Sequence, residues 1–151
     1  MRVRTRALVA AAVTLGLTVG GVDTGPVSAA PIIQLGRIRY DSPGSPDNAS
    51  NLNGETVAVR NVGTRTVTLT GWTLRDTADH EYRFGTFQLA AGKTVVVHTG
   101  SGTNSAGHRY WGLRSHVWNN TGDTAVLRTA AGTFIDRCTW PPATGSGYKD
   151  C

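Results

Sequence analysis

The sequence predicts an all-β protein built as a β-sandwich, and three observations support this. Short segments place apolar residues at every second position, as strands with one buried face do. Turn-forming residues interrupt these segments about every eight to twelve positions, a spacing typical of a sandwich. No window carries a helical period with a cap at either end.

The N-terminal segment, residues 1–29, is predicted to be a secretory signal peptide. Three arginines in the first six positions form a positive region, and residues 7–19 are an apolar run too short to span a bilayer comfortably. Residues 27–29 (Val-Ser-Ala) resemble a cleavage site, although a membrane anchor is the alternative. No later segment is long and apolar enough to hold the protein in a membrane, so a secreted, extracellular location is expected.

Residues 30–151 are expected to form one domain, since their number suits a single core. The leader holds three basic residues and one acidic residue, so the net charge falls from +5 for the whole chain to +3 without it. An excess this small does not by itself argue for nucleic-acid binding.

The stretch over residues 55–76 carries the clearest strand pattern. Its alternating apolar residues are Val57, Val59, Val67, Leu69, Trp72 and Leu74. β-Branched and aromatic residues on one face suit a pleated, half-buried surface. Residues 61–63 (Asn-Val-Gly) predict a turn because Asn and Gly tolerate positive φ, and Gly71 predicts a bend. The stretch should therefore fold as strand, turn, strand, corner and strand.

The rest of the chain gives shorter strand signals. Strands are predicted over residues 32–40, 81–84, 93–98, 108–113, 124–128 and 133–137, with core positions at Phe87 and Leu89. Val95 and Val97 are expected to face one side of their strand, and Val96 and His98 the other. Gly36 predicts a β-bulge in the first strand. Residues 41–54 are rich in Pro, Gly, Asn, Asp and Ser, so an exposed loop is predicted there. In residues 117–123 a tight turn is predicted, with the Asp123 carboxylate capping backbone amides.

The chain has two cysteines, Cys138 and Cys151. In an oxidising compartment an even number favours a disulfide, which would close residues 139–151 into a C-terminal tail. Closing a loop of this size contributes about 3 kcal/mol in the chain-entropy model. A metal or redox pair is the alternative, but the spacing fits no common zinc pattern and there is no CxxC motif.

Several motifs occur in an order that resembles one known family. They are NLNGETVAVRNVG (51–63), TLTGWTLRD (68–76), GKTVVVHTGSGTN (92–104), YWG (110–112) and VWNNTGDTAVLRTAAGTFIDRC (117–138). Together they resemble the lamin-tail domain, an immunoglobulin-like module named after nuclear lamins and also found in secreted bacterial proteins. The resemblance implies an immunoglobulin-like β-sandwich over residues 30–138. It also implies a binding or positioning role without enzymatic activity.

One loop gathers oxygen ligands that could bind calcium weakly. The candidates are Asp41, Asp47 and Glu55, with Asn48, Asn51 and Asn53 between them. Calcium suits an extracellular loop with acidic and amide oxygens, but the spacing does not match the EF-hand pattern. The alternative is an ordinary solvated turn, and no other cofactor is expected.

Aromatic residues near the C-terminal half could form a binding platform, since they give large, rigid contact areas. The candidate binding residues are Arg109, Trp111, Trp118, Trp140 and Tyr148, with Tyr110 beside them. The alternative is that Trp72, Trp111 and Trp118 belong to the core and its corners. Trp140 and Tyr148 lie in the predicted tail and are expected to be more exposed.

Two further groups of residues bear on function. Seven arginines could line a polyanion-binding face: Arg60, Arg65, Arg75, Arg83, Arg109, Arg114 and Arg128. The acidic residues interleaved with them are Asp76, Asp79, Glu81 and Asp123, so the alternative is solvent-facing charge that keeps sheet edges from pairing. The histidines are scattered at positions 80, 98, 108 and 116, and no nucleophile elbow surrounds Ser101, so catalysis is not expected.

These observations predict a secreted, non-catalytic binding module at the cell surface or in the extracellular medium. Its partner would be a protein or cell-envelope ligand that the sequence does not identify. The alternative function is polyanion or nucleic-acid binding through surface arginines.

Overall fold

The computed structural model describes residues 32–44, 47–142 and 147–151. The predicted signal peptide lies outside these described residues. The elements in chain order are β1 (Ile33–Arg39), the 3₁₀ helix η1 (Leu52–Gly54), β2 (Thr56–Asn61), β3 (Val67–Thr68), β4 (Thr73–Arg75), β5 (Glu81–Arg83), β6 (Gln88–Leu89), β7 (Thr94–His98), β8 (His108–Tyr110), β9 (Asp123–Arg128), β10 (Phe134–Trp140) and β11 (Tyr148–Lys149). Within these ranges no helix has the length and apolarity needed to cross a membrane.

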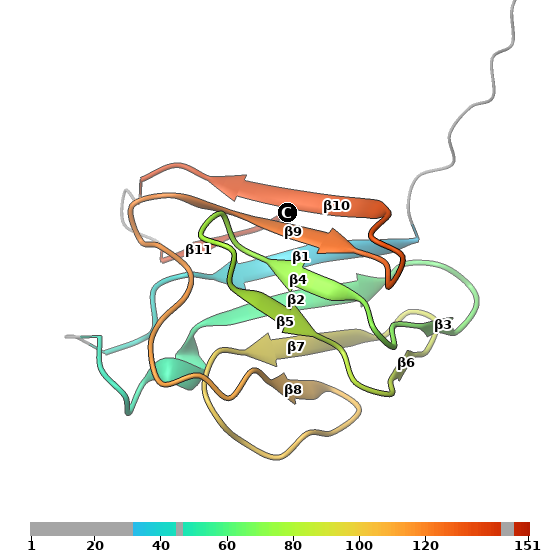
Figure 1. Cartoon of the computed structure of the whole chain (residues 1–151), viewed down its shortest axis with the longest axis horizontal. Coiled ribbons are helices and arrows are strands. Elements are labelled where there is room, and N and C mark those ends of the chain that lie inside the picture. Colours follow the sequence, from blue (N-terminus) through green and yellow to red (C-terminus); the bar gives the residue numbers. More distant parts are fainter. Residues whose placement is uncertain (1–31, 45–46, 143–146) are drawn as a thin grey trace, which may run out of the picture.

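The strands form two main sheets that pack face to face, as the sequence predicts. One has the order β11-β1-β2-β7-β8 and the other β10-β9-β4-β5, while β3 and β6 pair separately. Figure 1 shows β4, β5, β9 and β10 stacked in front of β1, β2 and β7. The pairings are antiparallel except that between β7 and β8, which is parallel. The all-β sandwich is thus confirmed.

The core comes from the alternating residues of the central strands. Val57 and Val59 of β2 lie opposite Val97 and Val95 of β7, and each is at most 2% exposed. From the other sheet Leu74 contributes a fully buried side chain. Burying one such side chain stabilises the fold by about 1.5–3 kcal/mol. The predicted period of two therefore separates the inward and outward faces correctly.

A row of aromatic rings runs through the core. Tyr40 stacks on Trp140 at a centroid distance of 5.3 Å, and Trp140 meets Trp118 edge-on at 6.0 Å. Trp118 in turn meets Trp111 at 6.0 Å, and Trp111 meets Tyr82 at 5.8 Å. Stacked and edge-to-face pairs at these distances add stability beyond that of the buried area. The row links both sheets to the segment between β8 and β9.

Both predicted corners of the central stretch are present. Gly71 adopts a φ of 79°, which only glycine reaches without strain, and the chain bends there into β4. The turn after β2 works differently from the prediction, since neither Asn61 nor Gly63 has a positive φ. Instead the buried Asn61 side chain donates to the carbonyls of Arg65 and Leu89 and accepts from the Gly63 N–H.

Strand ends differ from the sequence prediction in the C-terminal half. The strand predicted over residues 108–113 ends at Tyr110, because the next N–H groups turn back to the β7 end: Trp111 donates to His98 and Leu113 to Thr99. The strand predicted over residues 133–137 continues to Trp140, which pairs with Asp123. The predicted bulge in β1 is confirmed by a register shift between Leu35 and Ile38.

The C-terminal segment is fixed to the sandwich by several contacts. Cys138 and Cys151 form the predicted disulfide. β11 pairs with β1, and Arg37 of β1 makes two hydrogen bonds to the Asp150 carboxylate at 2.7 and 3.0 Å. These bonds lower the pKa of Asp150. The Arg37 guanidinium also lies 4.2 Å from the centroid of the Tyr148 ring.

Candidate binding surface

Four exposed arginines lie on the outward face of the four-stranded sheet, Arg75, Arg83, Arg128 and Arg137, and the first three line one hollow. Thr73 of β4 lies opposite Arg83 of β5 on one side and opposite Arg128 of β9 on the other. Arg75 follows two residues after Thr73, so it points to the same face. We call Arg75, Arg83 and Arg128 the arginine face. Together with Glu81 and the 129–132 turn they line a hollow of about 220 Å³.

Acidic side chains neutralise part of this face. Glu81 accepts from Arg75 and from Arg83, each at 2.7 Å, and Asp79 accepts from Arg75 at 3.1 Å. The hydrogen bond from Arg75 is the main reason that the pKa of Glu81 is lowered. These are solvent-exposed ion pairs, which contribute little to stability because water and salt screen them.

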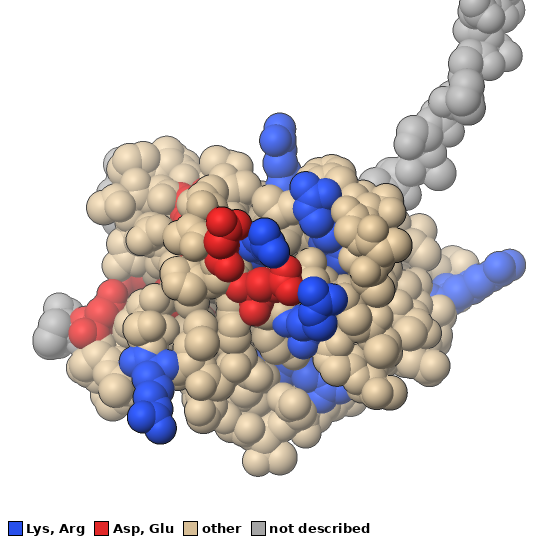
Figure 2. All heavy atoms as spheres, viewed as in Figure 1, with Lys and Arg blue, Asp and Glu red and all other residues tan. Residues whose placement is uncertain are grey.

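Of the three residues of the arginine face, Arg128 is the one that has no acidic partner among the described residues. Its guanidinium donates to the Gly132 carbonyl at 3.0 Å and stands 6.0 Å from the Phe134 ring centroid. The face therefore keeps an excess of positive charge beside Arg128. Figure 2 shows Lys and Arg side chains interleaved with Asp and Glu over the middle of this side of the molecule.

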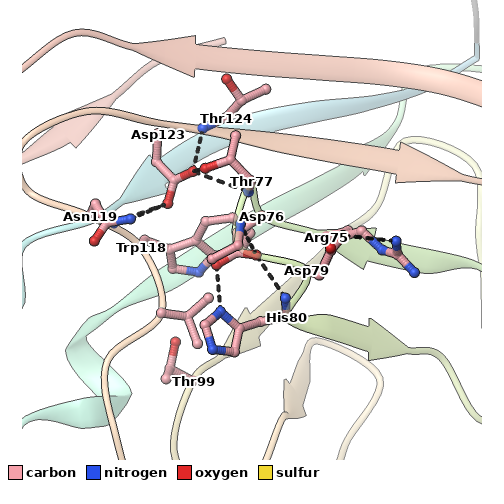
Figure 3. Close-up of polar contacts among 12 residues, drawn as sticks. Arg75, Asp76, Thr77, Asp79, His80, Thr99, Trp118, Asn119, Asp123 and Thr124 are labelled. Carbon is pink, nitrogen blue, oxygen red and sulfur yellow. Dashed lines mark hydrogen bonds and ion pairs between the residues drawn. The ribbon is translucent and has the colours of Figure 1, made fainter.

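Three carboxylates turn inward instead and form a second feature, which we call the carboxylate clamp: Glu55, Asp76 and Asp123. Their residues are 0%, 4% and 5% exposed. A buried carboxylate is costly unless it accepts hydrogen bonds. Each of the three does so, and each binds donors from a loop (Figure 3 shows those at Asp76 and Asp123).

Glu55 binds the segment that precedes β9. It accepts from the Thr99 hydroxyl at 2.5 Å and from the N–H groups of Val117 and Trp118, both at 2.9 Å. Burial raises the pKa of Glu55, while these hydrogen bonds and the charge of nearby His116 oppose that rise. The carboxylate thus holds the β7 end and the Trp118 backbone against the start of β2.

Asp123 holds the other side of the same segment. It accepts from the Thr77 hydroxyl and the Thr124 N–H, both at 2.7 Å, and from the Asn119 N–H at 3.2 Å. The Asn119 carbonyl in turn accepts the indole N–H of Trp140 at 2.9 Å. The predicted capping by Asp123 is confirmed.

Asp76 orders the turn between β4 and β5. Its carboxylate accepts from the backbone N–H groups of Ala78 and His80 at 2.9 and 2.8 Å, and it meets the Nδ1 atom of His80 at 2.6 Å. The turn that contains Asp79, which lies at a φ of 68°, is closed in this way. Asp79 thereby reaches Arg75 on the arginine face.

The family model for the lamin tail domain matches residues 26–142, which is most of the chain. The protein belongs to the lamin tail domain family. A search of curated proteins finds no match to it. As a lamin tail domain it has the immunoglobulin-like sandwich that its motifs indicate, and the Trp-Asn-Asn-Thr-Gly-Asp motif is the segment held by the clamp.

The arginines predicted to share one surface of this lamin tail domain are dispersed. Arg60 lies on β2 in the opposite sheet, and Arg65 and Arg114 lie in loops. Arg109 of β8 turns toward the core, with its guanidinium 4.0 Å from the Phe87 ring centroid. Of the seven, Arg75, Arg83 and Arg128 come together.

The predicted aromatic platform does not assemble on the surface. Trp118 and Trp140 are 3% and 2% exposed, so the expectation that Trp140 is exposed is wrong. The reason is the longer β10, which carries Trp140 inward onto Tyr40. Trp111 is partly buried against the core, and Tyr148 lies partly buried beneath Arg37.

The predicted calcium ligands do not meet either. The sequence groups Glu55 with Asp41 and Asp47 in an exposed loop, but the Glu55 side chain is buried and accepts hydrogen bonds from protein donors. Asp41 is exposed, and Asp47 faces His116 at 3.9 Å and Asn120 at 3.4 Å. In the part of the chain that the structure describes, no three His, Cys, Asp or Glu side chains gather as metal ligands.

Proposed function

We propose that this lamin tail domain acts outside the cell as a non-catalytic binding module, and that the arginine face contacts its partner. The observation that carries the proposal is the excess positive charge at the hollow beside Arg128, on a rigid sheet. The inward carboxylates support a role without chemistry, since their oxygens already accept donors from the fold.

The extracellular location has two supports. The N-terminal segment has the sequence pattern of a signal peptide. The Cys138–Cys151 disulfide is of the kind that forms and persists in an oxidising compartment. Fractionation of producing cells should find the chain in the medium or envelope fraction, without residues 1–29 and with both thiols protected from alkylation. A full-length chain with free thiols in the cytoplasm would contradict this part of the proposal.

The binding role is tested by charge reversal on the arginine face. Immobilised wild-type protein is expected to retain a partner from the envelope fraction that the Arg83→Glu/Arg128→Glu variant does not retain. The matched control is Arg65→Glu/Arg114→Glu, which changes the net charge equally at two exposed loop positions. Equal retention by all three proteins would remove the arginine face from the proposal.

The second candidate is polyanion binding on the same face, favoured because Arg128 has no acidic partner there among the described residues. Lys and Arg contacts to phosphates make binding depend on salt, with a slope of about 0.9 per phosphate for duplex DNA. The wild type should bind a DNA duplex with a salt slope about two units steeper than Arg83→Ala/Arg128→Ala. The Arg65→Ala/Arg114→Ala control should keep the wild-type slope; identical slopes for all three would exclude this candidate.

A further inference from the structure

Two histidines that look scattered in the sequence meet on the outer face of the five-stranded sheet. His98 is the last residue of β7 and His108 the first of β8, ten positions later. The Nε2 atom of His98 lies 2.9 Å from the Nδ1 atom of His108. The parallel pairing of β7 and β8 brings the rings together, since His98 lies opposite Tyr110 and His108 is two residues away on the same face.

The hydrogen bonds of His98 fix which nitrogen is available. Its Nδ1 atom lies 2.9 Å from the backbone carbonyl oxygen of Asn53. A carbonyl oxygen only accepts, so Nδ1 carries the proton, and Nε2 of the neutral ring presents its lone pair to His108. A ring N–H donated to a backbone carbonyl is the arrangement that orients metal-binding histidines and raises their basicity.

The His98 half of the site is held in place before any ion binds. The Tyr110 ring stacks on the His98 ring at a centroid distance of 4.8 Å and 14°. The Asn53 side chain donates to the Ser101 carbonyl at 2.8 Å, which anchors the residue that orients His98. His108 is exposed and can turn, so its ring supplies the adjustment that a shared ligand requires.

In the absence of metal the contact between the two rings is a hydrogen bond that Nδ1–H of His108 donates to Nε2 of His98, and a metal ion would take the place of that proton once the neutral His108 ring carries its proton on Nε2. With metal–nitrogen bonds of about 2.0–2.1 Å, two nitrogens bound at the right angle that copper and nickel prefer stand about 2.8–3.0 Å apart, close to the observed 2.9 Å. We propose that His98 and His108 form a solvent-open site for a divalent transition-metal ion, with water completing the coordination. Imidazole ligands suit copper, nickel and zinc, and Cu²⁺ binds most tightly in the general affinity order.

The test is a calorimetric titration of the purified full chain and its variants with Cu²⁺ and, separately, with Zn²⁺. The wild type should bind one Cu²⁺ at this site, and His108→Asn should weaken that binding at least tenfold. His98→Asn should do the same, and it provides a second variant should one fold poorly by circular dichroism. The matched control is His80→Gln, which removes a histidine in the turn between β4 and β5.

A spectroscopic readout separates the site from other copper-binding groups. Electron paramagnetic resonance of the Cu²⁺ complex should show two imidazole nitrogens in the wild type and one in His108→Asn. The N-terminus is common to all the proteins, so any copper that it binds cancels in the comparison. Equal affinity and equal spectra for the wild type and His108→Asn would overturn the proposal, as would a loss confined to His80→Gln.

Discussion

The carboxylate of Glu55 accepts a hydrogen bond from the backbone N–H of Trp118 at 2.9 Å, although the two residues stand 63 positions apart. One end of this contact is the start of β2, and the other is the segment that leads into β9. The Trp118 ring then continues the aromatic row between Trp111 and Trp140. The polar contact and the ring contacts therefore depend on one another, because both need the same backbone position.

The first prediction concerns the removal of this acceptor. Glu55→Ala leaves the hydroxyl of Thr99 and the N–H groups of Val117 and Trp118 without their partner. Unsatisfied buried donors are costly, so the free energy of unfolding should fall by about 3 kcal/mol in urea denaturation. Glu81→Ala, which removes an ion-paired residue at the surface, should change it little. An equal decrease in the free energy of unfolding for both variants would show that the buried Glu55 carboxylate adds no more stability than a surface ion pair.

The second prediction concerns pH. Because burial raises the pKa of Glu55 above its ordinary value of 4.5, the folded state binds more protons than the unfolded state in that range. The associated stability is full below pH 4.5 and is lost as pH rises through the folded pKa. The side chain introduced by Glu55→Gln does not titrate. The free energy of unfolding of the wild type should therefore fall relative to that of this variant as the pH rises above 4.5. A difference independent of pH would contradict the raised pKa.

The fold could be predicted from the local sequence pattern because apolar and polar residues alternate regularly along its core strands. Val57, Val59, Val95 and Val97 are buried as their period of two requires. Strand ends were less predictable, since they depend on partners distant in sequence. The added length of β10 comes from pairing with β9, and it decides that Trp140 is buried.

The site could be predicted only in part, because sheet order brings its residues together. Arg83 and Arg128 become neighbours through Thr73, which requires that β4 lie between β5 and β9. Asp123 follows a turn motif, and its capping role was evident from that motif. Glu55 follows a polar loop and looks like a surface residue, since its donors lie far along the chain.

The third prediction concerns the turn held by Asp123. Gly122 has a φ of 110°, and a Cβ atom there would lie 3.2 Å from the backbone of Pro142 and of Trp140. Gly122→Ala should therefore lower the free energy of unfolding by about 1–3 kcal/mol, through backbone strain and crowding. Gly107→Ala is the matched control, because a Cβ atom there meets nothing within 4 Å. Thermal melts of the two variants compare the sites directly. Equal melting temperatures for Gly122→Ala and Gly107→Ala would contradict the backbone strain expected at position 122.

The fourth prediction concerns the C-terminal disulfide. Cys138 and Cys151 are 13 positions apart, so removing the bond frees a short loop in the unfolded chain. In the chain-entropy model Cys138→Ala/Cys151→Ala should lower the free energy of unfolding by about 3 kcal/mol.

The loss should begin locally, because β11 is held to β1 by few backbone pairs and by the exposed Arg37–Asp150 ion pair. Hydrogen exchange should therefore accelerate at Lys149, in the edge strand β11, before it does at Val97, which lies in the β2–β7 ladder inside the same sheet. The control is Asp150→Asn, which removes the ion pair but keeps the disulfide and should leave the global stability nearly unchanged. Uniform acceleration across both strands in the double variant would mean that the tail unfolds with the whole domain and not ahead of it.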